Sequence, residues 1–160
     1  MPKSKTKPPI EEIIHQYIKG EKLNNINEFL DFLKGQKLRT VWKSHDSWQV
    51  NYKGKLLLKI YLDENGWYVR HFDSLNLTHW LADADRYITD DNLRQYILTR
   101  IKLPHCPNCE PFPLTIFGKS FERICYHCPF YIDNPANETL ECAKTLTLAK
   151  MQIIVDMKTK

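Results

Sequence analysis

Residues 47–69 read SWQVNYKGKLLLKIYLDENGWYV, and apolar side chains recur at every second position through most of this stretch. A period of two is typical of β-strands that bury one face. Polar, glycine-containing breaks at 53–55 and 63–66 divide the stretch into three strands joined by short loops. The stretch therefore predicts an antiparallel meander with one buried face and one open face.

The register of the meander follows from the rule that facing residues share a side of the sheet. A three-residue loop at 53–55 places apolar residues opposite one another in three pairs: Tyr52 with Leu56, Val50 with Leu58, and Trp48 with Ile60. A two-residue loop would pair Trp48 with Lys59, so we reject it. A four-residue loop at 63–66 adds two further apolar pairs, Leu62 with Trp67 and Ile60 with Val69.

Helical patterns flank the meander on both sides. Residues 1–8 are expected to be a disordered basic tail, and two amphipathic helices then end at Gly20 and Gly35. The segment LRTVWKS, residues 38–44, supplies a fourth strand. Residues 76–101 are expected to be helical with a break near residue 88, after which Thr89 or Asp90 caps the second helix. Residues 9–101 thus form an α+β domain: a four-stranded antiparallel meander packed on helices.

Four of the five cysteines lie in residues 105–128, HCPNCEPFPLTIFGKSFERICYHC. Their spacing, Cys-x2-Cys-x15-Cys-x2-Cys, is that of a four-cysteine zinc site, with the expected ligands Cys106, Cys109, Cys125 and Cys128. The insert between the pairs contains material for a hairpin, around a turn at Gly118-Lys119. Four thiolates leave no coordination position for water or substrate, so we expect structural Zn²⁺. Residues 102–160 are thus a zinc-ribbon-like module with a C-terminal helix.

Several alternatives remain open for these cysteines. They can be ordinary cysteines without metal, or a rubredoxin-like iron centre, although Glu110 and Pro129 stand where such turns usually carry glycine. His105 or His127 can replace a cysteine ligand. Cys142 is either a small buried hydrophobic residue on the C-terminal helix or a backing residue or alternative ligand of the zinc site.

Polar and aromatic residues occupy the open face of the predicted meander. The candidate binding face consists of Gln49, Lys53, Lys59, Tyr61, Tyr68 and Arg70. Aromatic rings flanked by cations can stack bases and neutralise phosphates of single-stranded nucleic acid. Tyrosine and lysine also suit any half-solvated pleated surface, which is the simpler interpretation. Leu57 and Phe72 are expected on the same face and suggest that part of it is covered.

Composition and charge restrict the class of protein. The 160 residues carry a net charge of +4, which is unevenly distributed: residues 34–60 are basic and residues 61–91 are acidic. The start, MPKSKTKPPI, lacks the apolar run of a secretory signal, and no stretch is long and apolar enough for a membrane helix. We therefore expect a cytoplasmic protein without a membrane partner. A reducing compartment favours metal ligation over disulfides.

The sequence contains no recognisable catalytic motif. Histidines and aspartates in residues 71–91 could line a cleft between the sheet and the zinc module: His71, Asp73, His79, Asp83, Asp85, Asp90 and Asp91. Their spacing matches no definite site, and helix caps and solvated loops account for the aspartates.

Four segments carry a resemblance: VWKSHDSWQVNYKGK, the paired cysteines, TIFGKSF and ECAK. Together they look like a group of small uncharacterised bacterial proteins in which an α+β part precedes a cysteine-rich tail. The likeness covers about residues 25–150 and implies no particular site or reaction. The Cys-Pro-x-Cys turn is separately similar to zinc-ribbon knuckles, although Glu110 stands where glycine is common.

The sequence therefore predicts a non-catalytic, zinc-stabilised interaction or regulatory module. Its partner can be a protein, a single-stranded nucleic acid or a small ligand. One alternative is an enzyme with a cleft between sheet and zinc module. Another is a redox protein that carries iron or exchanges thiols.

Overall fold

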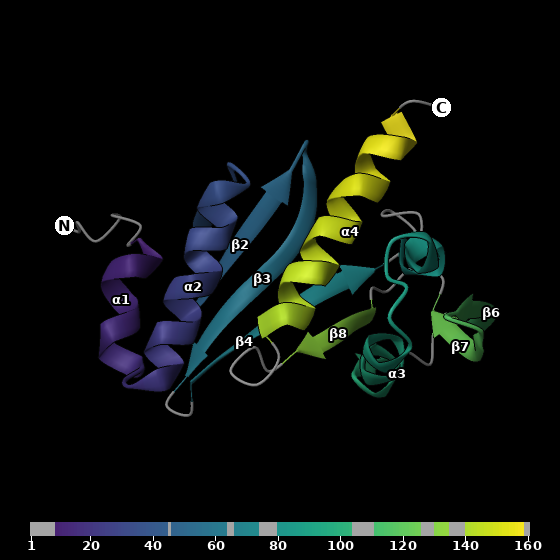
Figure 1. Ribbon diagram of the computed structural model, residues 1–160, viewed down its shortest axis with the longest axis horizontal. Coiled ribbons are helices and arrows are strands. Elements are labelled where there is room, and N and C mark those ends of the chain that lie inside the picture. Colours follow the sequence, from purple (N-terminus) through teal and green to yellow (C-terminus); the bar gives the residue numbers. More distant parts are fainter. Residues whose placement is uncertain are drawn as a thin grey trace.

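The computed structural model describes residues 9–44, 46–63, 66–73, 80–103, 111–125, 130–134 and 140–158 (Figure 1). In chain order the elements are α1 (Ile10–Tyr17), α2 (Glu21–Gly35), β1 (Thr40–Ser44), β2 (Ser47–Tyr52), β3 (Lys55–Asp63), β4 (Gly66–Asp73), the 3₁₀ helix η3 (Trp80–Arg86), α3 (Asp91–Thr99), β5 (Ile101–Lys102), β6 (Pro111–Ile116), β7 (Lys119–Cys125), β8 (Phe130–Asn134) and α4 (Leu140–Lys158). The predicted tail, residues 1–8, lies outside the described residues.

The protein is α+β, and its main sheet has six antiparallel strands in the order β1-β2-β3-β4-β8-β5. The predicted four-stranded meander forms its first part. The expectation that the sheet stops at four strands is wrong, because β8 pairs with β4 and β5 pairs with β8. Figure 1 shows α1, α2 and α4 on one side of the sheet.

The register of the meander is confirmed at its centre and corrected at its first turn. Val50 faces Leu58 and Trp48 faces Ile60 as expected, but Tyr52 faces Lys55 instead of Leu56. The loop has two residues, Lys53 and Gly54, both with positive φ as a type I′ turn requires. A bulge absorbs the extra residue, since Asn51 faces Leu56 while Val50 faces Leu58.

The bulge also corrects the position of Leu57. Leu57 is the unpaired residue between Leu56 and Leu58 on β3, and it is fully buried in the same core cluster as Leu58. It therefore belongs to the covered face of the sheet and not to the open face, where strict alternation would place it. The second turn is as predicted, with Leu62 opposite Trp67 and Ile60 opposite Val69.

Helix α4 lies between two hydrophobic clusters. Ala143 and Ile154 belong to the first cluster, together with buried residues of α1, α2 and the covered face of the meander. Leu146 and Ile153 belong to the second, which is built from η3, α3, the β6–β7 hairpin and β8. The C-terminal helix therefore links the two parts of the core. No helix in the described part of the chain is long and apolar enough to cross a membrane.

Polar side chains are buried where α4 meets the sheet. The Lys150 ammonium donates hydrogen bonds to the carbonyl oxygens of Leu57 at 3.0 Å and Phe72 at 2.9 Å. The Leu57 carbonyl needs this donor, because a buried backbone oxygen without one costs about 1–3 kcal/mol. The Phe72 carbonyl also accepts from Trp80 Nε1 at 2.7 Å. Lys150 thus ties α4 to β3 at the bulge and to β4 beside it.

The opposite orientations of neighbouring residues on β3 give a stability prediction. Ile60 is fully buried and Lys59 lies on the other face of the sheet. Ile60→Ala should lower the free energy of unfolding by about 2–5 kcal/mol, since it removes buried methyl groups and leaves a cavity. Lys59→Ala should change it by less than about 0.5 kcal/mol. Urea unfolding measures both, and equal losses would contradict this orientation.

Candidate functional site

The face of the sheet opposite α2 and α4 carries the candidate binding residues. Pairing across the strands aligns Gln49 on β2, Lys59 on β3, Arg70 on β4 and Asp133 on β8 in one row. Each of these residues is partly exposed. We call this surface the outer face and this set of four residues its polar row.

Tyr61 and Tyr68 form a stacked pair beside the polar row. They face each other across β3 and β4, with ring centroids 5.0 Å apart and ring planes inclined by 7°. The predicted register, which sets Leu62 opposite Trp67 and Ile60 opposite Val69, also places Tyr61 opposite Tyr68. Burial is the largest cause that raises the pKa of Tyr68, although Arg70 opposes it. The Tyr68 phenol is therefore uncharged at neutral pH and does not repel an anion.

Arg70 is held between aromatic rings. Its guanidinium carbon lies 4.9 Å from the ring centroid of Tyr61, 5.2 Å from that of Tyr68 and 4.5 Å from that of Tyr131. An arginine in contact with ring faces is stabilised by cation–π attraction and loses rotational freedom. The side chain is still 29% exposed, so its charge is fixed in position and accessible from solvent.

Asp133 partly neutralises Arg70. The Arg70 Nε atom is buried and 3.7 Å from Asp133 Oδ1, which is an ion-pair distance but too long for a hydrogen bond. Both side chains are nearly one-third exposed, so solvent weakens their attraction. A phosphate that approaches from solvent can therefore compete with Asp133 for the guanidinium.

The remaining predicted residues border the polar row. The Lys59 ammonium lies 5.6 Å from the ring centroid of Phe72, and Gln49 Nε2 donates a hydrogen bond of 3.0 Å to Asn51 Oδ1. Lys53 is exposed in the turn between β2 and β3, with its ammonium over the ring of Tyr52. All six residues predicted for the binding face thus lie on β2–β4 or in their connecting turn.

Sequence reasoning missed the contribution of β8, which brings Tyr131 and Asp133 to the outer face. Residues 130–134 read FYIDN and stand between Pro129 and Pro135. Their alternation of Tyr131 and Asp133 with the buried Ile132 is a period-two signal, but it covers only five residues. Its position inside the predicted zinc module obscured its pairing with β4.

The predicted metal ligands are only partly covered by the structure. Cys106, Cys109 and Cys128 lie outside the described residues, as do His105 and His127, and of Cys125 only the backbone is described. Within the described part of the chain, no group of three or more histidine, cysteine or acidic side chains could hold a metal ion. The zinc site therefore stays a prediction.

The insert between the cysteine pairs does form the predicted hairpin. β6 pairs with β7, and Pro111 faces Cys125 at its open end. The turn lies at Phe117 and Gly118, both with positive φ, one residue earlier than the expected turn. Since Cys109 precedes Pro111 by two residues, the hairpin brings the two ends of the insert together.

Cys142 is buried in the second cluster beside Leu146. Burial raises the pKa of its thiol to about 12, against a smaller opposing effect of Arg100. The thiol is therefore protonated and chemically inert in the folded protein at neutral pH. The metal ligands that Cys142 was expected to back lie outside the described side chains.

The residues considered for an enzyme cleft do not come together, as far as their side chains are described. His71 is fully buried in the core, whereas Asp83, Asp85 and Asp91 are exposed. The exposed Asp90 caps α3, as predicted, by accepting hydrogen bonds from two backbone amides. His79 lies outside the described residues, and the side chain of Asp73 is not described.

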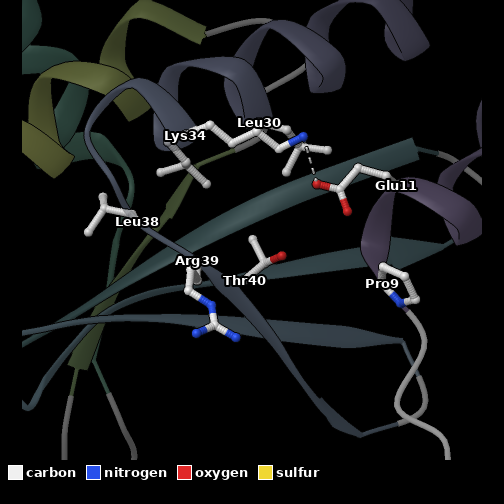
Figure 2. A pocket seen from close by; sticks show the side chains of 8 residues that line it. Pro9, Glu11, Leu30, Lys34, Leu38, Arg39 and Thr40 are labelled. Atoms are coloured by element: carbon white, nitrogen blue, oxygen red, sulfur yellow. Dashed lines mark ion pairs between the residues drawn. The ribbon is translucent and has the colours of Figure 1, made fainter.

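A small pocket lies elsewhere, between α1, α2 and the start of β1 (Figure 2). Its volume is about 220 Å³, and it is lined by Pro9, Glu11, Leu30, Leu33, Lys34, Leu38, Arg39 and Thr40. Lys34 Nζ is 3.3 Å from Glu11 Oε2, so these two charges pair with each other. The pocket is below the usual size for a small-molecule site and contains none of the predicted site residues.

The chain has no match among protein-family models, curated proteins or solved structures. The resemblance to small bacterial proteins therefore stays a prediction.

The buried His71 gives a pH prediction. The Thr147 hydroxyl donates to the carbonyl of Ala143, so it accepts from His71 Nε2 at 3.2 Å. Burial, together with the charge of Lys150, lowers the pKa of His71 to about 3, although a hydrogen bond to the Ala143 backbone opposes this. The unfolded chain instead binds this proton near pH 6.5. The contribution of His71 to stability is therefore complete above about pH 6.5 and declines as the pH falls towards 3.

His71→Gln should remove this dependence. Between pH 4 and 6, the wild-type free energy of unfolding should fall more steeply than that of the variant, by about 1.4 kcal/mol per pH unit. Urea titrations at several pH values measure both slopes. Parallel slopes would show that His71 is protonated in the folded state over this range.

Proposed function

We propose that the protein is a non-catalytic binding module that holds single-stranded nucleic acid on the outer face of its sheet. The observation that carries this proposal is the cluster of Tyr61, Tyr68 and Arg70, in which an accessible cation lies against a stacked aromatic pair. Both groups needed for a single strand are present there: flat rings for the bases and a charge for the phosphates.

The outer face also suits a polyanion in its overall charge. Lys59 and Arg70 lie in the polar row, and Lys53 extends the positive charge to the turn beside it. Two carboxylates oppose these cations: Asp133 in the row, which already pairs with Arg70, and Asp63, which lies two residues beyond Tyr61 on the same side of β3. Neutralisation of phosphates by lysine and arginine supplies most of the sequence-independent affinity for nucleic acids.

Access favours a single strand over a duplex. Bases reach an aromatic ring only when they are not enclosed in base pairs, and stacking on a side chain contributes about 1–3 kcal/mol per base. In the described part of the chain, the helices that cover the sheet pack on the face opposite the outer face. The rings of Tyr61 and Tyr68 are therefore partly exposed. The module would bind many sequences, because every base has a flat face.

We further propose that Cys106, Cys109, Cys125 and Cys128 bind one structural Zn²⁺ and complete a zinc-ribbon-like module. Two observations support this proposal: the spacing of the cysteines and the β6–β7 hairpin, whose open end joins the segments that carry them. Cysteine thiolates in a tetrahedral set are preferred ligands of zinc. Zinc would add stability at the open end of the hairpin, beyond the burial of Ile116 and Ile124 in the second cluster.

The binding proposal predicts that the protein binds a fluorescein-labelled oligothymidylate with an affinity that falls as salt rises, measured by fluorescence anisotropy. Lys59→Gln should reduce the slope of log affinity against log salt by about 0.7, the value for one phosphate contact on a single strand. The double variant Tyr61→Leu/Tyr68→Leu should lose about 1–3 kcal/mol for each base that stacks there. Asp133→Asn should strengthen binding, since it removes the competing carboxylate from Arg70.

Matched controls separate this surface from general charge and aromaticity. Lys119→Gln removes an exposed lysine from the β6–β7 hairpin, and Tyr87→Leu removes an exposed tyrosine that follows η3. Both should bind like the wild type. A further variant replaces Lys59, Tyr61, Tyr68 and Arg70 together. If it binds the oligonucleotide as tightly as the wild type, the outer face is not the binding surface.

The metal proposal predicts one zinc per chain by elemental analysis of protein purified without added metal. A thiol reagent should find the four clustered cysteines protected, and a chelator should expose all four. The fifth thiol, Cys142, should react only on unfolding, because it is buried and its pKa is about 12. Iron, or four reactive thiols before chelation, would contradict structural zinc.

A further inference from the structure

The outer face continues beyond the predicted binding residues onto β8 and β5. Phe72 on β4 faces Tyr131 on β8, and Tyr131 faces Lys102 on β5. The ring centroids of Phe72 and Tyr131 are 5.6 Å apart, with their planes inclined by 48°. Both rings are partly exposed, and Lys102 is exposed. A second aromatic pair with a neighbouring cation thus lies on the same face.

Strand geometry places the polar row between the two aromatic pairs. Along β4 the outward side chains are Tyr68, Arg70 and Phe72, two residues apart in sequence. A strand rises about 3.4 Å per residue, so the Cα atoms of Tyr68 and Phe72 are separated by roughly 14 Å, with Arg70 midway. Lys59 lies beside Arg70 on β3, and its ammonium reaches the ring of Phe72.

The order of groups is therefore aromatic pair, cations, aromatic pair. This order matches a single strand that crosses the sheet along β4, with a base at each end and phosphates between them. Stacked bases of one strand are only about 3.4 Å apart, so two stacked neighbours cannot occupy both pairs. The strand must be extended and its bases unstacked from each other.

We infer that Phe72 and Tyr131 form a second base-stacking site, and that the outer face binds an extended single strand through two separated bases with phosphates over Lys59 and Arg70. The inference rests on the proposed function, since it names the part of the ligand that lies beyond Tyr61 and Tyr68. Both sites share Arg70, whose guanidinium lies 4.5 Å from the ring centroid of Tyr131.

The test uses oligothymidylates that are lengthened one nucleotide at a time, measured by anisotropy on the full chain. The wild type should gain affinity in two steps, the second when the oligonucleotide becomes long enough to reach both aromatic pairs. Tyr131→Leu should remove the second step, a loss of about five- to a hundredfold for the longer oligonucleotides. It should weaken binding of the shortest binding oligonucleotide far less, since that ligand is affected only through the contact between Tyr131 and Arg70.

Two further variants guard against an indirect effect through Arg70 or the fold. Tyr131→Phe keeps the ring and should retain the second step, because stacking needs the ring and not the hydroxyl. Phe72→Leu should also reduce the second step. This variant leaves the three rings around the Arg70 guanidinium in place. An equal loss of affinity at every oligonucleotide length in Tyr131→Leu would instead limit Tyr131 to the support of Arg70, and would overturn the second site.

The outcomes separate this inference from the proposed function. If oligothymidylates bind and the Tyr61→Leu/Tyr68→Leu variant binds weakly, but Tyr131→Leu binds like the wild type at every length, the second site is rejected and the proposed function stands. If no oligonucleotide binds in a salt-sensitive manner at any length, the proposed function and the second site are both rejected.

Discussion

The backbone pairing of β4 with β8 is the interaction on which both faces of the sheet depend. It brings Ile132 into the second hydrophobic cluster on one face and Tyr131 and Asp133 to the outer face on the other. Because strand side chains alternate, a shift of one residue in this pairing would exchange the two sets. It would bury a carboxylate and expose an isoleucine. Core packing therefore determines which groups surround Arg70.

Helix α4 supports this arrangement from the covered side. Lys150 extends from α4 to the carbonyls of Leu57 and Phe72, so the bulge on β3 and the end of β4 are held by one ammonium. The side chain of Phe72 lies on the outer face, while its carbonyl accepts a hydrogen bond from Lys150 on the covered side of the sheet. The packing of α4 thus helps to fix the end of the proposed binding surface that lies nearest β8.

The proposed surface combines order with exposure. Three rings contact the Arg70 guanidinium, so little conformational freedom remains to be lost when an anion binds. Asp133 lowers the affinity for an anion, because the anion must first displace this carboxylate from Arg70. The neutral Tyr68 adds area for stacking without adding negative charge. Stacking and charge are therefore contributed by different side chains that hold one another in place.

Local patterns in the sequence were enough to predict the α+β class, the helix that ends at Gly35, the Asp90 cap, the β6–β7 hairpin and the Tyr61–Tyr68 and Lys59–Arg70 pairs. The first helix was also predicted, but it ends at Tyr17, three residues before Gly20. These features depend on local periodicity, on turn residues or on the register of neighbouring strands, all of which are visible within short stretches. The bulge at Leu57 and the pairing of β8 with β4 depend instead on long-range contacts. The bulge forms because the favoured two-residue turn and the apolar register disagree by one residue, and core burial enforces the register. The β4–β8 pairing joins residues about sixty positions apart, and only the shared core, not any local pattern, selects that partner.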